Sequence, residues 1–199
     1  MDPSAAAGRY PKARIDALSD GVFAVAMTLL VLDLHLPDAL APDAPHLAAA
    51  LVDLWPKFAA YALSFAILGM RWLSNAQVTS RAEHFSGSYL AWWLFYLLLI
   101  TCVPFTTTLV GRFAGLAPAT WLYAANTGLL AVAAGRMAAL TPELHDPLLM
   151  RRRQWGLAVL LASALLCFGL SFVLPKLALW AFALNFIAPA LTRRLERKR

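Results

Sequence analysis

The sequence predicts an all-α polytopic membrane protein with six transmembrane helices and both termini in the cytoplasm. Of its 199 residues, 61% are hydrophobic and only 14% are charged, whereas roughly a quarter of the residues in a soluble domain are charged. A helix needs about 20 residues to cross a bilayer, so the apolar content suffices for six crossings. Such a surplus of apolar groups excludes a soluble enzyme, a disordered chain and a nucleic-acid-binding domain.

Apolar runs separated by polar or proline-containing segments define the expected spans, which together form one transmembrane domain over residues 1–199. Pro56 and Lys57 interrupt the second run, which favours a kink or a break between an interfacial helix and the span itself. Pro104 lies near the end of the third run, where the threonines behind it are expected to bond backbone groups that the proline frees. The expected spans are 17–36, 47–75, 88–111, 117–140, 155–174 and 177–191.

The basic residues predict the orientation of these spans, because cytoplasmic loops are enriched in Lys and Arg. With the N-terminus placed inside, all but three of the 17 Lys and Arg residues fall in inner segments. The exceptions are Lys57, Arg112 and Lys176. We therefore expect both termini to be cytoplasmic.

The first span is unusual because two carboxylates, Asp16 and Asp20, lie one helical turn apart at its start. Ionisable groups in a membrane helix are costly and usually face protein or water. Asp16 suits an interfacial position at the helix start, where the helix dipole favours a carboxylate. Asp20 lies about a turn deeper and needs a partner, for which Arg14 is the nearest candidate in the sequence.

Beyond Asp20, Val25, Leu29 and Leu32 recur on one face of the expected helix, with Thr28 beside them. From periodicity alone this stripe is ordinary core or lipid-facing surface, because nearly every membrane helix has one. In the second span, Ser64, Trp72 and Asn75 are expected to form hydrogen bonds with neighbouring helices.

No motif indicates catalysis or a bound cofactor. The sequence has neither an H-E-x-x-H motif nor clustered Cys and His, which argues against a metal site. It also lacks a phosphate-binding glycine loop and a G-x-S-x-G element. The expectation is a protein that is not an enzyme, binds no metal or other cofactor and has no nucleic-acid partner. The four histidines are His35, His46, His84 and His145.

Three segments resemble a known family. The first runs Arg14-x-x-x-Leu18-Ser19-Asp20 and leads into an apolar helix that contains Thr28 and ends at Asp33. It resembles the arginine-x-x-x-phenylalanine-serine-aspartate signature of the transmembrane protein 175 (TMEM175) family of potassium channels, in its bacterial six-span type. Similarity continues in the second span at Tyr61, Ser64, Phe65 and Trp72, and in the third at Pro104, Phe105 and Thr106.

Two departures from the family pattern matter. Leu18 stands where the family has phenylalanine, which only changes an apolar shape. Asn75 and Ala76 stand where the family commonly has histidines. No histidine-based role is therefore carried over to this chain.

The resemblance implies a homotetramer in the bacterial inner membrane, with potassium as the permeating ion and a fourfold pore lined by the first helix. It assigns the narrow position to Val25, a polar layer to Thr28 and further apolar layers to Leu29 and Leu32. Asp20 lies about 140° from Val25 around the helix, so the signature implies a packing network rather than a pore lining. The network residues are Arg14, Ser19, Asp20, Trp72 and Asn75.

Two other functions remain open at this stage, a small secondary transporter and a non-conducting membrane scaffold. Transporters tend to have paired repeats and broken helices that meet at the midplane, and the sequence shows neither. A scaffold would tolerate rearrangement of the apolar residues in the first span, whereas a pore face would not.

Overall fold

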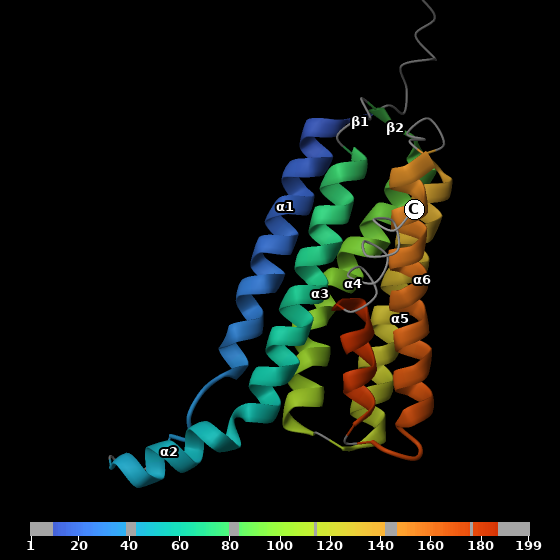
Figure 1. Ribbon diagram of the computed structural model, residues 1–199. Coiled ribbons are helices and arrows are strands. Elements are labelled where there is room, and N and C mark those ends of the chain that lie inside the picture. The colour runs from blue at the N-terminus through green and yellow to red at the C-terminus, as the bar shows by residue number, and fades with distance from the viewer. Residues whose placement is uncertain are drawn as a thin grey trace, which may run out of the picture.

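The computed structural model describes residues 10–38, 43–79, 84–113, 115–141, 147–175 and 177–186. Its long helices run alternately in opposite directions and form an elongated bundle (Figure 1). The helical segments are α1 (Lys12–Leu29), the 3-10 helix η2 (Leu30–Asp33), α2 (Ala44–Asp53), α3 (Trp55–Thr79), α4 (Gly87–Arg112), α5 (Ala117–Ala139), α6 (Pro147–Leu170) and the 3-10 helix η4 (Ala178–Ala183). Two short strands, β1 (Tyr10–Pro11) and β2 (His84–Phe85), pair antiparallel at the end where α1 begins.

Five predicted spans correspond to helices in the structure, with boundaries shifted by a few residues. α1 begins at Lys12, before the predicted residue 17, and α6 begins at Pro147, before the predicted residue 155. The sixth predicted span, 177–191, is described as far as residue 186 and begins as the 3-10 helix η4. Among the described residues, three helical segments are long and apolar enough to cross a membrane, and the bent pair α2–α3 would make a fourth. All-helical membrane architecture is thus confirmed, while the number of crossings stays a prediction.

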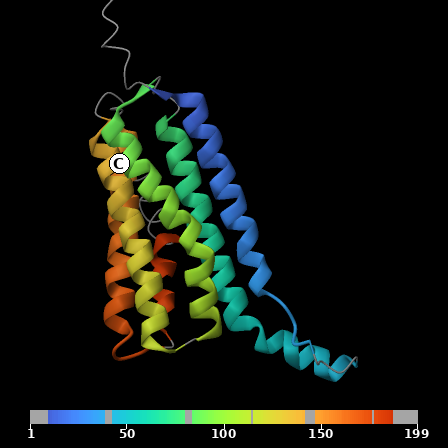
Figure 2. The same ribbon diagram turned by 180° about the vertical axis from the view of Figure 1, so that it is seen from behind.

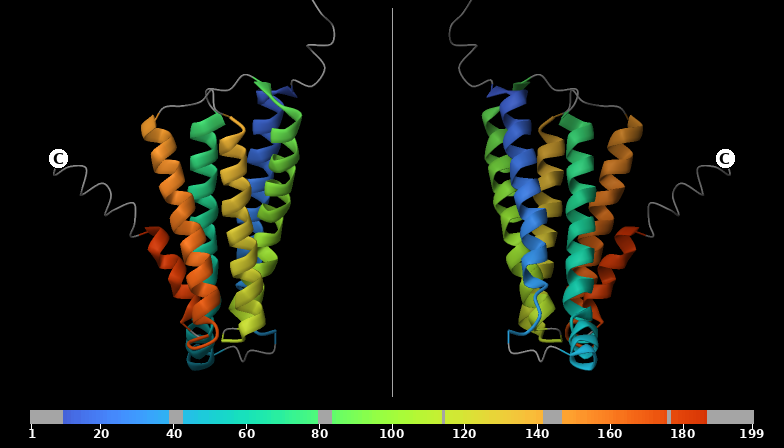
Figure 3. Two further views of the ribbon diagram at one scale, coloured as in Figure 1. Left: turned by 90° about the vertical axis from the view of Figure 1, so that its right-hand side faces the viewer. Right: turned by 90° about the vertical axis from the view of Figure 1, so that its left-hand side faces the viewer.

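The break predicted near Pro56 is present. α2 and α3 meet at Leu54 with a bend of 47°, and Pro56 is the second residue of α3, where a missing N–H costs no helical bond. Asp43 caps α2 by accepting a hydrogen bond from the His46 backbone N–H at 2.9 Å. α2 extends sideways from the end of the bundle opposite the start of α1 (Figures 1 and 3).

The core of the bundle lies where α4 and α5 pack against each other and against α3 and α6. Ile100, Leu130 and Leu160, from α4, α5 and α6, are at most 1% exposed. Three hydroxyls form a buried hydrogen-bonded chain inside this core: Thr107 and Ser64 are 2.8 Å apart, and Ser64 and Tyr123 are 3.0 Å apart. The prediction that Ser64 reaches neighbouring helices is therefore confirmed, because its partners lie on α4 and α5.

The threonines after Pro104 bond differently from the expectation. The missing N–H of Pro104 frees the carbonyl of Ile100, yet the hydroxyls of Thr106 and Thr107 both donate to the carbonyl of Val103, at 3.1 and 2.8 Å. A helical threonine hydroxyl reaches a carbonyl three or four residues earlier, so neither threonine reaches Ile100. The expectation that they compensate directly for the proline is wrong.

Candidate functional site

One side of α1 is packed into the bundle. Its buried residues recur every three or four positions, and none is more than 4% exposed. They contact α3 and α4, which flank α1 at the outer edge of the bundle (Figure 2). The contacting side consists of Ile15, Ser19, Phe23, Ala26 and Leu30. Their spacing fixes the rotation of α1 about its own axis.

The four residues predicted to face a pore all lie away from that packed side. Val25 is 58% exposed, Leu29 44% and Leu32 67%, and Thr28 is also exposed. The hydroxyl of Thr28 lies 3.0 Å from the carbonyl oxygen of Ala24 and 2.9 Å from that of Val25, and it donates to them. The single chain thus leaves uncovered an apolar strip with one hydroxyl in it.

Two tryptophans hold the signature residues at the start of α1. The indole N–H of Trp93 donates to the hydroxyl of Ser19 at 2.8 Å, and both residues are buried. The indole N–H of Trp72 donates to Oδ1 of Asp20, also at 2.8 Å, at an exposed position. Each bond joins α1 to a different helix, Trp93 from α4 and Trp72 from α3.

These bonds partly change the expected network. Arg14 is the nearest candidate partner in the sequence, but it makes no ion pair with Asp20 among the described residues. The partner of Asp20 is Trp72. Asp16 instead pairs with Lys12 at 3.5 Å, one turn earlier on α1. Asn75 lies one turn beyond Trp72 on α3 and lines a pocket with Arg71.

Trp93 is the residue that sequence reasoning missed. The signal was available, because a buried indole N–H almost always needs an acceptor and the third span carries two adjacent tryptophans, Trp92 and Trp93. The sequence does not reveal which of the two faces the bundle. In the structure Trp93 is 5% exposed and bonded to Ser19, whereas Trp92 lies 5.6 Å from the guanidinium of Arg136.

A second polar cluster lies at the opposite end of α1. The guanidinium of Arg112 donates to Oδ1 of Asp33 at 2.9 Å, and its Nη2 lies 3.4 Å from Nε2 of His35. Gly111 lies beside this pair, and a Cβ there would be in van der Waals contact, 3.6 Å from Oδ2 of Asp33 and 3.4 Å from Cα of Lys57. This ion pair joins the end of η2 to the end of α4.

Within the described residues no group of three or more His, Cys, Asp or Glu side chains is placed to hold a metal ion. The polar groups near α1 therefore join helices to one another, and the exposed strip lacks ionised side chains at Val25, Thr28, Leu29 and Leu32.

Sequence comparison gives matches over about half of the chain. Residues 14–104 match the family model for the endosomal/lysosomal potassium channel TMEM175. A protein from Chamaesiphon minutus named as a potassium channel is 36% identical over 100 residues, which are 50% of this chain and 49% of that protein. A second protein named as a potassium channel, from Streptomyces collinus, is 37% identical over 100 residues, with 50% and 48% covered. The chain thus matches about half the length of these relatives.

Human TMEM175, named as an endosomal/lysosomal proton channel, is 40% identical over 70 residues, which are 32% of this chain and 14% of that protein. The fold match is longer. The crystal structure of a lysosomal potassium-selective channel TMEM175 homolog from Chamaesiphon minutus covers 88% of this chain and 95% of its own, with a TM-score of 0.76 and 28% identity. The family match at 14–104 and this agreement in fold confirm the predicted resemblance of the chain to the TMEM175 family.

Proposed function

We propose that four copies of this chain form a potassium-permeable cation channel whose pore is lined by α1. In this arrangement the chain crosses a bacterial inner membrane six times with both termini in the cytoplasm. The permeating ion is K⁺, and the protein needs no cofactor. Potassium as the ion is supported by the bacterial relatives that are named as potassium channels and by the potassium-selective homolog from Chamaesiphon minutus.

The observation that carries the proposal is the uncovered side of α1. A helix in a single bundle needs only to bury one side, and α1 does so through Phe23 and its neighbours. The opposite side presents Val25, Leu29 and Leu32 at successive turns. In a fourfold assembly with these strips around the axis, the apolar side chains would form stacked rings.

Apolar rings of this kind affect both the hydration of the pore and the hydration shell of the ion. Valine and leucine offer K⁺ no ligands, so an ion must keep most of its hydration shell or lose it at a cost. A narrow apolar constriction therefore gates by dewetting. Potassium holds its water less tightly than sodium does, so the ring favours potassium modestly, and the Thr28 layer adds oxygen atoms to the path.

The directions of the helices agree with the proposed orientation. The start of α1, the end of α3 and the start of α6 lie at one end of the bundle (Figure 1), and these segments carry Arg14, Arg71 and the 151–153 triplet. Lys57 and Arg112 lie at the other end, on the start of α3 and the end of α4. The excess of basic residues at one end supports a cytoplasmic position for it.

The decisive experiment is ion flux from proteoliposomes under potassium and then sodium gradients. Replacing Val25 or Leu29 by Asn places amides in the ring and hydrates it, so flux should rise about tenfold, a barrier lower by about 1.4 kcal/mol, with less discrimination between the two ions. Leu165→Asn on α6 is the matched control, because Leu165 is 65% exposed on a different helix. Equal effects at all three positions would remove α1 from the pore.

The same preparation separates the other functions. A non-conducting scaffold gives no flux with any variant, and a transporter gives flux that saturates and depends on a coupled gradient. Since the vertebrate relatives are named as proton channels, a pH-sensitive dye in the vesicles measures whether protons move as well. Chemical crosslinking that stops at the dimer would contradict the tetramer.

A further inference from the structure

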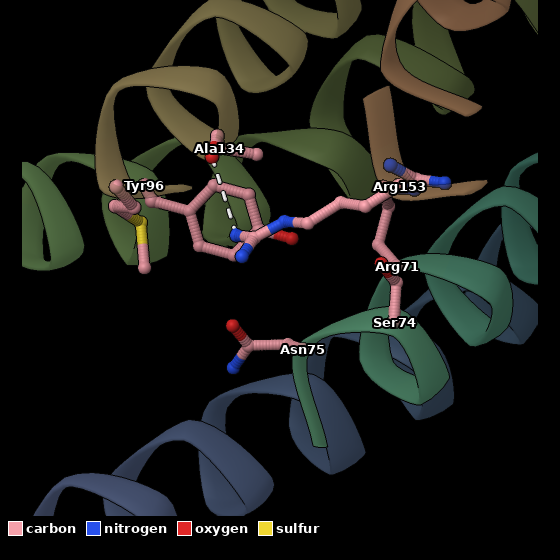
Figure 4. Close-up of a pocket in the computed structure, with 7 residues that line it drawn as sticks. Arg71, Ser74, Asn75, Tyr96, Ala134 and Arg153 are labelled. Atoms are coloured by element: carbon pink, nitrogen blue, oxygen red, sulfur yellow. Dashed lines mark hydrogen bonds between the residues drawn. The ribbon is translucent and has the colours of Figure 1, made fainter. Parts of the chain in front are cut away.

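Two arginines line a small pocket that the proposed channel does not use, and their guanidinium groups extend in different directions (Figure 4). The pocket is lined by residues of α3, α4, α5 and α6 (Figure 4). Arg71 comes from α3 and Arg153 from α6. The other polar residues that line it are Ser74, Asn75 and Tyr96.

Arg153 is a buried cation with an unused donor. The residue is 8% exposed, and its Nη2 donates to the carbonyl oxygen of Ala134 at 3.2 Å. Its Nη1 is buried and has no hydrogen-bond partner among the described residues. Figure 4 shows the side chain extending toward Ala134 and Tyr96, with Asn75 reaching into the same space from α3.

Arg71 and Tyr96 add further donors to the pocket. Neither makes a hydrogen bond or an ion pair with another described residue. Arg71 lies against α6, since a Cβ on Gly156 would be 3.4 Å from its Nη2. Tyr96 is 3% exposed as a whole, and its hydroxyl faces the pocket.

The described carboxylates near this end of the bundle are engaged elsewhere. Asp16 pairs with Lys12 on α1, and Asp20 accepts the indole N–H of Trp72. Burying a guanidinium without a counter-charge is costly, and a second cation nearby raises that cost. Among the described residues no carboxylate lines the pocket, so its charge favours a negative ligand.

We propose that this pocket binds a single small inorganic anion of the size of chloride, held by Nη1 of Arg153 and the Tyr96 hydroxyl. The free space is about that of one water molecule, so phosphate and sulfate do not fit, and chloride requires a small outward shift of the lining side chains. Neither donor has a hydrogen-bond partner among the described residues, so both are available to an anion. The ligand would neutralise the charge of Arg153 and join α6 to α4. The inference does not depend on the proposed channel activity.

Thermal unfolding of the purified full-length chain in detergent tests it. Sodium gluconate is replaced stepwise by sodium chloride at constant ionic strength, and the midpoint of unfolding is recorded. A ligand that binds only the folded state raises the midpoint, by about 3 °C at ten times its Kd. Sodium sulfate at the same ionic strength should give no comparable rise.

Two variants locate the effect. Arg153→Gln removes the buried charge, so it should unfold in gluconate at a temperature no lower than the unsubstituted chain and should lose the response to chloride. Arg151→Gln removes an equal charge from an exposed position two residues away and should keep the response. If Arg153→Gln fails to fold, Tyr96→Phe replaces it, since it keeps both charges and should weaken chloride binding several-fold.

Three results would overturn the proposal. A midpoint that is the same in chloride and gluconate would mean that the pocket holds only water. An equal rise in sulfate would indicate a general salt effect. A full chloride response in both Arg153→Gln and Tyr96→Phe would place the anion somewhere else.

Discussion

The two sides of α1 differ in their contacts with other helices and in the apolar surface that they leave exposed. The packed side combines tight apolar contacts around Phe23 with one buried hydrogen bond, from Trp93 to Ser19. The other side, which includes Val25, Leu29 and Leu32, stays uncovered. The bond from Trp72 to Asp20 lies between the two sides, near the start of the helix. The same helix is thus fixed in rotation by its packed side, while its other side is available for an assembly.

The largest effect expected from this comparison is on stability. Phe23→Ala opens a cavity between α1 and its neighbours and should lower the free energy of unfolding by about 3 kcal/mol. Val25→Ala removes a side chain that is 58% exposed and should change it by less than about 0.5 kcal/mol. Denaturant unfolding of both variants in detergent micelles measures the difference. Equal losses would mean that the two sides are equally packed in the assembled protein.

A smaller effect is expected at the Ser19–Trp93 bond. Ser19→Ala leaves a buried indole N–H without an acceptor, which costs about 1–3 kcal/mol. Trp93→Phe removes the donor and leaves the Ser19 hydroxyl alone. If the bond is what matters, the double variant loses at least about 0.5 kcal/mol less than the sum of the two single losses. Strictly additive losses would show that these residues act only through packing.

The smallest effect is expected at Asp20, because its bond to Trp72 is exposed. Asp20→Ala should lower the free energy of unfolding by about 0.5–1 kcal/mol and reduce the yield of assembled protein. Asp20→Asn keeps an acceptor for the indole N–H and should recover most of that loss. Unfolding midpoints of the two variants measure the loss of stability, and size-exclusion profiles measure the yield of assembled protein. An Asp20→Ala variant of normal stability whose ion preference alone changes would place Asp20 in the pore.

Local features of the fold followed from the sequence, whereas pairings between helices did not. Hydropathy predicted five helices close to their observed positions, and Pro56 predicted the break between α2 and α3. Periodicity grouped Val25, Leu29 and Leu32 on one side of α1. It did not reveal which side is packed, because α1 is apolar nearly all round and the period is the same for core and lipid.

The hydrogen-bond partners of Asp20 and Ser19 could not be predicted from the sequence either, because they are distant along the chain. Arg14 is near Asp20 along the chain, but Trp72 is 52 positions away and Trp93 is 74 positions from Ser19. Such pairings depend on the rotation of α3 and α4 relative to α1, which no single helix specifies. The burial of Arg153 could not be predicted from the sequence, because the basic triplet at 151–153 next to a span predicts a solvated loop.

The hydroxyl of Thr28 has one proton, and that proton is directed back into α1, toward the carbonyl oxygens of Ala24 and Val25. The dipole of the hydroxyl therefore turns its negative end outward. A species that reaches the exposed side of α1 meets an electron pair there and no hydrogen. In the proposed channel a cation would gain a ligand at this position and an anion would not, so the intrahelical bonding of Thr28 supports the passage of cations.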